Sequence, residues 1–362
     1  MNTEVNSKIK LKNDGVINIA VGRNRKELKW KNKQMKWSEF LDRVSQTTRT
    51  AETYEEYKKL SKGEQDNVKD VGGFVGGTLK NGRRKSNSLL NRCLLTLDVD
   101  YGKEGLWDTI EMLFDFGCCI YTTHKHSKNK PRFRLIIPIS RSVNPEEYGA
   151  VSRMVAKDIG INYFDDTTYE PSRLMYWPST SQDGEFVFKY IDEKWLNPDE
   201  VLNKYEDWHD TSFWPESSRS IKKREKLADK QGNPREKGGI IGAFCRSYTV
   251  MDAVEKFLSD IYVPCADKNR YTYTKGSTSG GLVIYENGDF AYSHHGTDPV
   301  SGKLCNAFDL VRLHKFGSLD EDVKEGTPIN RMPSFKAMQE LSMKDNEVKR
   351  QIAEEHIKNA RE

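Results

Sequence analysis

The sequence of 362 residues has no long hydrophobic run and few cysteines. No apolar stretch approaches the ~18 residues that a membrane-spanning helix needs, and residues 1–14 lack the hydrophobic segment of a secretory signal. The six cysteines include the adjacent Cys118 and Cys119, which indicates reduced core residues rather than a disulfide framework. We therefore expect a cytoplasmic protein with no membrane partner.

The net charge is also small, at +4, although the chain carries 58 basic and 54 acidic residues. The basic residues are concentrated in two early segments. Residues 21–37 hold seven Lys or Arg and one Glu, and residues 80–92 hold five and no acidic residue. Such a local excess of positive charge predicts a polyanionic partner.

Length and composition predict two folded parts. Chains beyond about 250–300 residues generally divide into domains. Periodicity is lost in residues 206–238, where Pro, Ser, Gly and alternating charges mix, so we expect a linker there. It would join a larger domain at 1–205 to a smaller α+β domain at 239–325, followed by a charged helical tail at 326–362.

Strands and helices alternate within the first 205 residues. Apolar runs bounded by turn residues predict strands, and apolar residues three or four apart predict helices. The expected strands are 16–22, 93–100, 118–123, 132–139 and 185–191, and the expected helices are 38–44, 51–70, 106–116, 146–160 and 197–206. Residues 29–37 are expected to be a polar arm. This order predicts an α/β (α+β) fold with a mixed sheet.

The strand at 93–100 ends in two carboxylates, Asp98 and Asp100. Residues i and i+2 of a strand point to one face, so the two like charges repel unless a cation lies between them. Carboxylates combined with substrate phosphates are ligands that Mg²⁺ prefers. The alternative is a strand that simply ends in solvent, where Asp is common, so the pair alone does not decide between the two.

Two further polar groups accompany this pair. Asp165 and Asp166 precede an ordered loop, and either would supply a third carboxylate; the alternative is a helix cap or a turn. Arg132 and Arg134 lie two apart on one strand, which holds two guanidiniums on one face in an arrangement that binds phosphate. The alternative for the arginines is a solvated polar face.

Three motifs in this order resemble a known family: LLTLDVD at 94–100, THKHSKNKPRFRLIIP at 123–138 and FDDTTYEPSRLMYWPS at 164–179. They are similar to the catalytic core of the archaeo-eukaryotic primase superfamily. The resemblance is closer to the primase-polymerase region of phage and mobile-element replication proteins, including the part that precedes the helicase in relatives of virulence-associated protein E. It covers about residues 15–205.

The resemblance implies a DNA primase-polymerase that transfers nucleotides from NTP or dNTP to a 3′-hydroxyl on a single-stranded DNA template. Asp98 and Asp100 would bind the catalytic Mg²⁺ or Mn²⁺ ions, with Asp165 as the third ligand and Asp166 as its neighbouring competitor. A replicative helicase, fused or separate, would be a partner in phage or mobile-element replication.

The residue that binds the triphosphate is less clearly assigned. The family has a His that contacts the phosphates, and His124 matches it, with His126 nearby. The position before the apolar strand, however, holds Arg132 and Arg134. We favour the arginines and keep the histidines as second candidates, with Arg173 in the third motif as a further nucleotide-binding residue.

The two basic segments are expected to hold the phosphates of the template, which carries no sequence information. The residues assigned to this role are Lys29, Lys31, Arg83, Arg84 and Lys85. Trp30, Trp37 and Phe74 lie among or near these charges and can stack on bases; the alternative is that they belong to the core.

Two other functions remain open. His124-Lys125-His126 is similar to the His-hydrophobic-His motif of rolling-circle initiator endonucleases, although its middle residue is Lys; that chemistry also needs a nucleophilic tyrosine, for which Tyr148 and Tyr163 are available. The other alternative is a nucleic-acid-binding replication accessory protein without catalytic activity, in which the acidic residues are structural.

The second part of the chain is similar in its rhythm to the zinc-binding domain of bacterial-type primases. Most of the ligands are missing: His294, His295, Cys305 and Cys265 are the available residues, and their spacing is unlike known zinc motifs. We expect a metal-free module, with zinc unlikely and both histidines on a polar loop.

Overall fold

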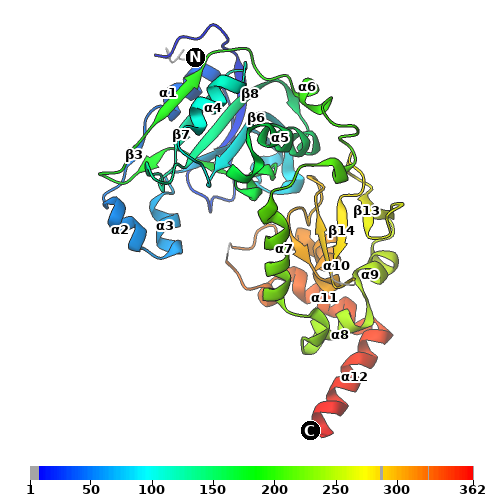
Figure 1. Cartoon of the computed structure of the whole chain (residues 1–362). Coiled ribbons are helices and arrows are strands. Elements are labelled where there is room, and N and C mark those ends of the chain that lie inside the picture. The colour runs from blue at the N-terminus through cyan, green and yellow to red at the C-terminus, as the bar shows by residue number, and fades with distance from the viewer. Residues whose placement is uncertain (1–7, 286–287, 325, 362) are drawn as a thin grey trace. The chain divides into compact units, whose positions relative to one another are not determined.

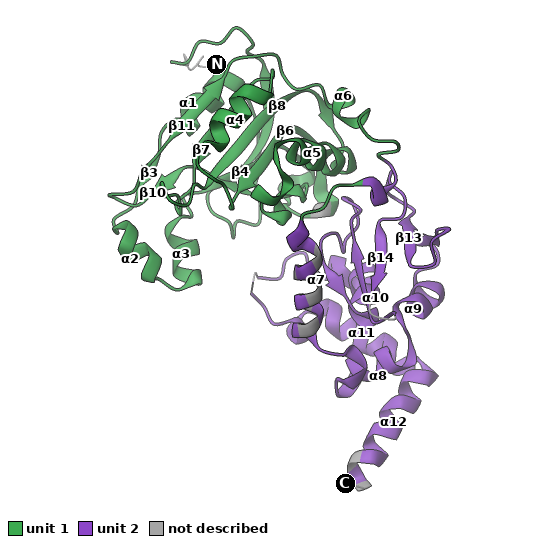
Figure 2. Ribbon diagram, viewed as in Figure 1, with its two compact units in different colours: residues 1–208, 214–217 green, residues 209–213, 218–362 purple. Residues whose placement is uncertain are grey.

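The computed structural model describes residues 8–285, 288–324 and 326–361 and divides into two compact units (Figure 2). Unit 1 comprises residues 1–208 and 214–217, and unit 2 comprises 209–213 and 218–362. The segment at 206–238 differs from the expected linker because it contains helix α7 (Ser218–Gln231). Its Lys, Glu, Leu and Ala residues favour a helix even though they lack a regular apolar pattern.

The central sheet of unit 1 has five strands in the order β11-β7-β8-β6-β5 (Figure 1). Its strands are β5 (Gly77–Leu79), β6 (Leu89–Val99), β7 (Cys118–Thr122), β8 (Phe133–Val143) and β11 (Phe188–Ile191). Every pairing in this sheet is antiparallel, so the expected mixed sheet is wrong here. The reason is that β8 lies between β6 and β7, the two strands that helix α4 (Leu106–Leu113) connects.

The two faces of this sheet are buried in different cores. On one face, Leu95, Leu97 and Val99 of β6 pack against α4 and α5 (Pro145–Ile159). On the other face, Leu94 and Ile136 pack with α1 (Trp37–Val44) and with residues of a second sheet. Successive residues of β6 therefore alternate between the cores, which places Asp98 on the face of the second sheet. Helix α6 (Pro198–Leu202) packs against α5.

The second sheet of unit 1 has the order β2-β1-β4-β9. Its strands are β1 (Val16–Gly22), β2 (Lys31–Lys36), β4 (Gly73–Val75) and β9 (Met175–Tyr176). The expected polar arm at 29–37 is instead mostly β2, an edge strand paired with β1 from Lys36 to Lys31. Lysines on an edge strand discourage pairing with other chains, so a polar strand is stable in this position.

The aromatic residues expected among the basic segments belong to the core. Trp30 and Trp37 are 2% exposed and Phe74 is fully buried, so of the two possibilities stated from sequence the core holds and stacking on bases does not. Trp37 and Phe74 both contact Phe40 of α1, in a stacked and in an edge-on arrangement. Burying these large aromatic rings in the core stabilises the fold, and this stabilisation would be lost if the rings were exposed to bind a ligand.

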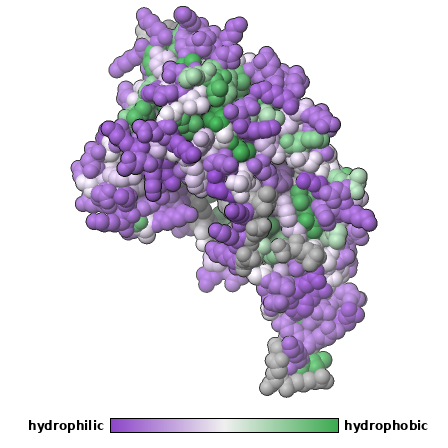
Figure 3. Space-filling view, in the orientation of Figure 1, coloured by the Kyte–Doolittle hydropathy of each residue, from purple (hydrophilic) through white to green (hydrophobic). Residues whose placement is uncertain are grey.

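The charged segment at 51–70, expected to be helical, forms two short helices. They are α2 (Tyr54–Lys59) and α3 (Lys62–Val68), and each begins at a capping box, formed by Thr53 with Glu56 and by Ser61 with Glu64. Strand β3 (Thr48–Arg49), which precedes them, pairs in parallel with β10 (Ser179–Thr180). Hydrophilic residues cover the surface around α2 and α3 (Figure 3).

Unit 2 is built on an antiparallel five-stranded sheet in sequential order. Its strands are β12 (Tyr262–Pro264), β13 (Arg270–Tyr273), β14 (Leu282–Tyr285), β15 (Phe290–Ser293) and β16 (Leu304–Cys305). Its further helices are α8 (Gly239–Ser247), α9 (Val250–Phe257), α10 (Ala307–Phe316), α11 (Pro333–Lys344) and α12 (Asn346–Arg361). The segment expected to be a charged tail contributes Met338 and Val348, both fully buried, to this core.

The two histidines of unit 2 directly follow β15; His294 is half-buried, and only His295 differs clearly from the expected polar loop. His295 is fully buried. Its Nε2 accepts hydrogen bonds from the N–H groups of Tyr273 (3.0 Å) and Gly281 (3.1 Å), and its Nδ1 is 2.7 Å from the hydroxyl of Thr278. Both ring nitrogens of His295 therefore form hydrogen bonds within unit 2. The likeness of unit 2 to a zinc-binding module remains a prediction from the sequence. None of the described helices is long and apolar enough to cross a membrane.

Asp298 anchors a second buried polar network in unit 2, and it makes this unit sensitive to acid. Burial by itself raises the pKa of Asp298, but hydrogen bonds from His314, Tyr262 and the N–H of Val300 outweigh it, so the pKa lies below its ordinary value. A depressed carboxyl pKa stabilises the fold above the unfolded-state pKa of about 4, and this contribution is lost as the pH falls through the lower folded-state value.

We therefore expect Asp298→Asn to lower the free energy of unfolding by about 3 kcal/mol at pH 7. The gap between Asp298→Asn and the unsubstituted protein should narrow as the pH falls below about 4, because the carboxyl group is then protonated in the unfolded state and the folded state loses this advantage as the pH approaches its lower pKa. Urea denaturation followed by circular dichroism at pH 7 and pH 3 measures both values. The exposed Asp260→Asn is the matched control, and a gap that is the same at both pH values would contradict the assignment.

Candidate active site

Two aspartates and two arginines face each other across strands β6 and β8. The register places Asp98 opposite Arg134, and its continuation places Asp100 opposite Arg132. Nη2 of Arg134 lies 3.7 Å from Oδ2 of Asp98, and Nη1 of Arg132 donates to Oδ1 of Asp100 at 2.9 Å. Because directly opposite residues of an antiparallel pair share a face, four charged groups are brought together at one end of the sheet.

The third motif joins this group through backbone hydrogen bonds. The N–H of Asp165 donates to the carbonyl of Asp98 at 2.9 Å, and the N–H of Asp98 donates to Oγ1 of Thr168 at 2.9 Å. Nη2 of Arg173 lies 3.7 Å from Oδ2 of Asp165. Asp98, Asp100 and Asp165 therefore each have their own arginine.

The adjacent carboxylates Asp165 and Asp166 have different surroundings. Asp165 accepts a hydrogen bond from the N–H of Thr167 (2.9 Å), so it also has the capping role that was its alternative from sequence. Asp166 instead accepts a hydrogen bond from the hydroxyl of Ser217. Of the two, Asp165 is the one that acts on the charge of Asp100.

The electrostatics of the site show how closely the carboxylates lie. The pKa of Asp100 is raised, first by burial and then by the negative charge of Asp98, with a smaller contribution from Asp165; Arg132 acts in the opposite direction. Oδ1 of Asp98 is buried and has no hydrogen-bond partner among the described residues. An unpartnered buried carboxylate oxygen is costly, and a bound cation would satisfy it.

The donor set fits a hard divalent cation bound with its substrate. Within residues 8–285, 288–324 and 326–361, no group of three or more His, Cys, Asp or Glu side chains is placed to hold a metal ion. Mg²⁺, however, is usually bound by one or two carboxylates, and water and substrate phosphates complete its shell. Asp98 and Asp100 match that description, and Oδ1 of Asp98 accepts no hydrogen bond within the described part of the chain.

Two lysines that the sequence did not single out lie beside these groups. Nζ of Lys69 lies 5.2 Å from the ring centre of Tyr176 and pairs with Asp66 at 2.7 Å. Partial burial lowers the pKa of Lys125, and the positive charges of Lys69 and Arg132 lower it further. The sequence signal for Lys125 was its place in the basic hairpin, whereas nothing marked Lys69. Together with the arginines, these cations form a positive rim suited to a triphosphate.

His124 is part of a buried network and does not face the aspartates. Its Nδ1 lies 3.1 Å from the hydroxyl of Ser179 and its Nε2 lies 3.0 Å from Oε1 of Glu52, while its ring packs on Tyr57 at 4.3 Å. Burial lowers the pKa of His124, although Glu52 opposes this effect. His124 therefore fixes the start of the hairpin to β10 and to the segment before α2.

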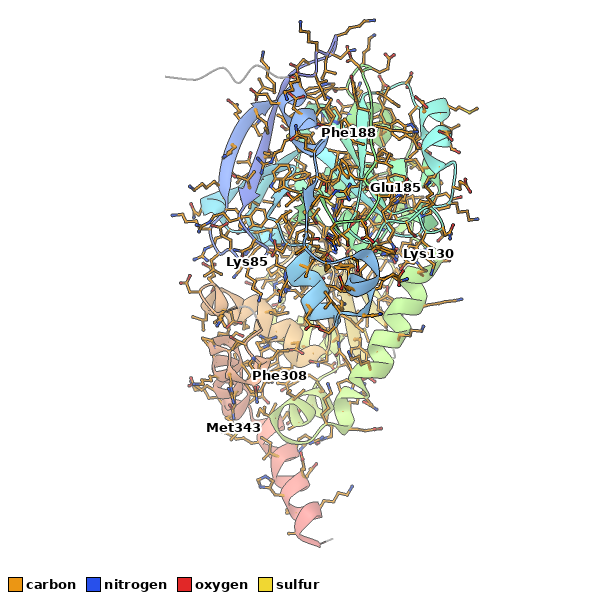
Figure 4. All side chains as sticks on the ribbon, turned by 90° about the vertical axis from the view of Figure 1, so that its left-hand side faces the viewer. Lys85, Lys130, Glu185, Phe188, Phe308 and Met343 are labelled. Atoms are coloured by element: carbon orange, nitrogen blue, oxygen red, sulfur yellow. The ribbon has the colours of Figure 1, made fainter. Side chains whose placement is uncertain are left out.

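His126 positions the backbone of Arg132. Its Nδ1 accepts a hydrogen bond from the N–H of Arg132 at 3.1 Å, and its Nε2 lies 3.8 Å from Glu185. Glu185 is labelled in Figure 4, as is Lys130, whose backbone bonds to Ser127 at the turn of the hairpin. The two histidines thus hold the hairpin in place, and the arginines are the residues that reach the carboxylates.

The two basic segments come together on the surface of unit 1. The N–H of Trp30 donates to the carbonyl of Gly82 at 2.8 Å, and the guanidinium of Arg84 lies over the Trp30 ring at 5.4 Å. Gly82 has φ +68°, and a Cβ there would lie 2.4 Å from the carbonyl oxygen of Trp30, so glycine is required for this contact. Lys29 and Lys31, both exposed, flank Trp30 and so lie beside the turn that leads into Arg83 and Lys85.

Comparison with known proteins identifies a family for most of unit 1. The sequence matches the family model of the VapE N-terminal domain over residues 2–217. Among solved structures, the AEP domain of the primase-polymerase (PrimPol) of cyanophage S-2L is 14% identical, with 52% of this chain and 88% of that chain covered and a TM-score of 0.29. No curated protein matches the sequence. Because the family model covers more than half of the chain, the chain belongs to the VapE N-terminal domain family.

Proposed function

We propose that unit 1 is a DNA primase-polymerase that transfers nucleotides from NTP or dNTP to a 3′-hydroxyl along a single-stranded DNA template. The observation that carries this proposal is the cross-strand group of Asp98, Asp100, Arg132 and Arg134, in which one buried carboxylate oxygen has no protein partner. The family match supports a role in the replication of a phage or mobile element, in which a helicase, fused or separate, would unwind the template.

In this proposal Asp98, Asp100 and Asp165 hold two divalent ions, Mg²⁺ or Mn²⁺. Bound there, the ions lower the pKa of the attacking hydroxyl and neutralise the leaving pyrophosphate. The protein keeps the carboxylates in position through the backbone hydrogen bonds that join Asp165 and Thr168 to Asp98. Asp166, which is engaged with Ser217, is the less suitable neighbour.

The two arginines have different roles. The side chain of Arg134 is 9% exposed, and its guanidinium lies near the rings of Tyr121 (5.7 Å) and Tyr176 (5.8 Å), so it is held against Asp98. The side chain of Arg132 is 28% exposed and bonds only the half-exposed Asp100 among the described side chains. Arg132 is therefore the residue that reaches an incoming triphosphate, with Arg173, Lys69 and Lys125 around it.

We expect Arg132→Ala to raise the KM for nucleotide about tenfold, because it removes a charge-assisted hydrogen bond to phosphate. Steady-state incorporation with varied nucleotide concentration measures this change, and circular dichroism tests that the fold is kept. Arg141→Ala is the matched control, since Arg141 lies in β8, the strand that Arg132 directly precedes, and pairs instead with Glu147 and Asp199. An unchanged KM in Arg132→Ala would exclude this residue from triphosphate binding.

Incorporation of labelled NTP and dNTP on single-stranded DNA, with and without a primer, tests the function itself. Products that need template and Mg²⁺ or Mn²⁺ support a polymerase, and products without a primer add priming. If no nucleotide is incorporated but DNA is nicked with a covalent tyrosine adduct, the endonuclease alternative holds. That alternative requires His124 to leave its network. Of its two candidate tyrosines, Tyr148 is fully buried against Thr168, whereas Tyr163 is half-buried.

The basic surface of Lys29, Lys31, Arg83, Arg84 and Lys85 is proposed to hold the template. In Figure 4, Lys85 of this surface and Lys130 of the hairpin of the candidate active site are labelled on opposite sides of unit 1. Phosphate contacts of this kind give affinity without sequence preference and weaken as salt rises. DNA binding that does not depend on salt would contradict the assignment, and binding without metal-dependent incorporation would favour the accessory alternative.

A further inference from the structure

A second positively charged pocket lies in unit 1, away from the aspartates. It has a volume of about 520 Å³ and is lined by residues of β1, β2, α1 and the segment after β9. The polar and aromatic residues of the lining that matter here are Arg23, Glu27, Lys31, Lys33, Arg43 and Trp177. A pocket of this size is large enough for a small organic ligand or one end of a larger one.

The charges of this pocket are unbalanced. Its only acidic residue is Glu27, which pairs with Arg23 at 3.0 Å and also accepts a hydrogen bond from the backbone N–H of Arg23. Among the described residues, Lys31, Lys33 and Arg43 form no ion pair. Lys31 is close enough to Glu27 for its charge to lower the pKa of that carboxyl, after the larger effect of Arg23. Four cations and one carboxylate therefore face one pocket, and this excess of positive charge favours a bound anion.

Arg43 is held in a fixed plane. Its guanidinium lies over the ring of Trp177 at 3.9 Å from the ring centre. Trp177 is 6% exposed and packs against Phe74 (4.7 Å) and Phe40 (6.0 Å), so the indole itself cannot turn. Partial burial lowers the pKa of Arg43 from its ordinary value. A stacked guanidinium keeps its N–H edge free for a bidentate contact with a phosphate.

The pocket is separate from the candidate active site. It lies on the sheet β2-β1-β4-β9, whereas the aspartates lie at the end of β6 in the other sheet. The chain neighbours Tyr176 and Trp177 serve the two sites: Tyr176 lies beside Arg134, and Trp177 lies beneath Arg43. None of the aspartates of the candidate active site lines the pocket.

We propose that this pocket binds a terminal phosphate group, either of a free nucleotide or of the end of a nucleic-acid strand. Three unpaired cations match the charge of about −2 on a terminal phosphate better than the single charge of a phosphodiester. Arg43 supplies the planar contact, and Lys31 and Lys33 on the edge strand β2 supply two point charges. The inference goes beyond the proposed function, because it holds whether or not unit 1 polymerises.

The test compares the binding of two single-stranded DNA molecules of one sequence, with a 5′-phosphate or a 5′-hydroxyl, to the full chain. We expect fluorescence anisotropy to give about tenfold tighter binding of the phosphorylated strand. Arg43→Gln, and separately Lys31→Gln with Lys33→Gln, should remove this preference. Lys157→Gln, which removes an exposed charge elsewhere in unit 1, should keep it. Because both lysines are exposed, we expect the double lysine variant to fold, so it tests the pocket even if Arg43→Gln does not fold.

Competitors distinguish the source of the phosphate. Inorganic phosphate and pyrophosphate should abolish the tighter binding of the 5′-phosphorylated strand. If a nucleoside triphosphate abolishes it at a lower concentration than inorganic phosphate, the ligand is a free nucleotide. If it does not, the ligand is a strand end. Equal binding of the two strands together with no competition by nucleotide overturns the proposal, as does a preference that survives in both variants. Asp98→Asn should retain the preference, so failure of the polymerase proposal leaves this result unaffected.

Discussion

Asp98→Asn is expected to reduce metal-dependent nucleotide incorporation by on the order of 10³-fold or more. The substitution keeps the size of the side chain and removes the charge of a carboxylate whose Oδ1 has no partner among the described residues. The remaining Arg134, with its side chain 9% exposed, then repels a cation that Asp98 would otherwise attract. Labelled-nucleotide incorporation on a primed single-stranded template measures the loss.

A second readout separates metal binding from folding. Electron paramagnetic resonance of Mn²⁺ should show weaker binding in Asp98→Asn and in Asp100→Asn, while thermal unfolding tests whether either variant is still folded. Asp108→Asn is the matched control, since Asp108 is an exposed carboxylate on α4 whose ion pair with Lys189, at 3.9 Å, lies outside the site. Full activity in a folded Asp98→Asn or Asp100→Asn protein would exclude the metal assignment.

The strands that carry the site were predictable from sequence because their patterns are local. The strand expected at 16–22 is β1 with the same bounds, and the apolar run before Asp98 forms the buried half of β6. The alternation of Arg132 and Arg134 also followed from the period of a strand. Local sequence therefore predicted which side chains share a face on each strand.

The partners across strands were not predictable, because they depend on register. Asp98 lies opposite Arg134 because β6 and β8 are neighbouring strands in this register. An irregularity between Arg92 and Leu94 shifts the register of the pairing before Leu94. Lys69 reaches the site through the turn after α3, a tertiary contact with no local signal. The polar β2 was missed for a similar reason: its stability comes from pairing with β1 and not from its own residues.

Arg92 is a buried residue that the sequence analysis assigned only to a basic segment, and it connects the site to the rest of the fold. It is fully buried, and no carboxylate among the described residues pairs with it. Its guanidinium donates to the carbonyl of Leu94 (3.0 Å), the carbonyl of Pro171 (2.8 Å) and the hydroxyl of Thr96 (2.7 Å), and it lies over the ring of Tyr148 at 4.1 Å. Burial lowers the pKa of Arg92.

Through Pro171, Arg92 ties the loop of the third motif to β6. Asp165 and Arg173 lie on either side of this proline in the chain, so the hydrogen bond from Arg92 to the carbonyl of Pro171 limits how far both can move from Asp98. Arg92 touches none of the proposed reacting groups and is a positioning residue. Its loss should therefore act on stability first and on the geometry of the third carboxylate second.

We expect Arg92→Met to lower the free energy of unfolding of unit 1 by about 3–5 kcal/mol, because two buried carbonyls and a buried hydroxyl lose a charged donor. Urea denaturation followed by tryptophan fluorescence reports on unit 1 alone, since all seven tryptophans lie within it. Arg141→Met, which breaks a partly exposed ion pair in the same sheet, should cost only about 0–1 kcal/mol. Where the Arg92→Met protein is still folded, Mn²⁺ binding should weaken less than in Asp98→Asn. A loss of stability below about 1 kcal/mol would show that these carbonyls find other donors, because a buried acceptor left without one costs at least that much.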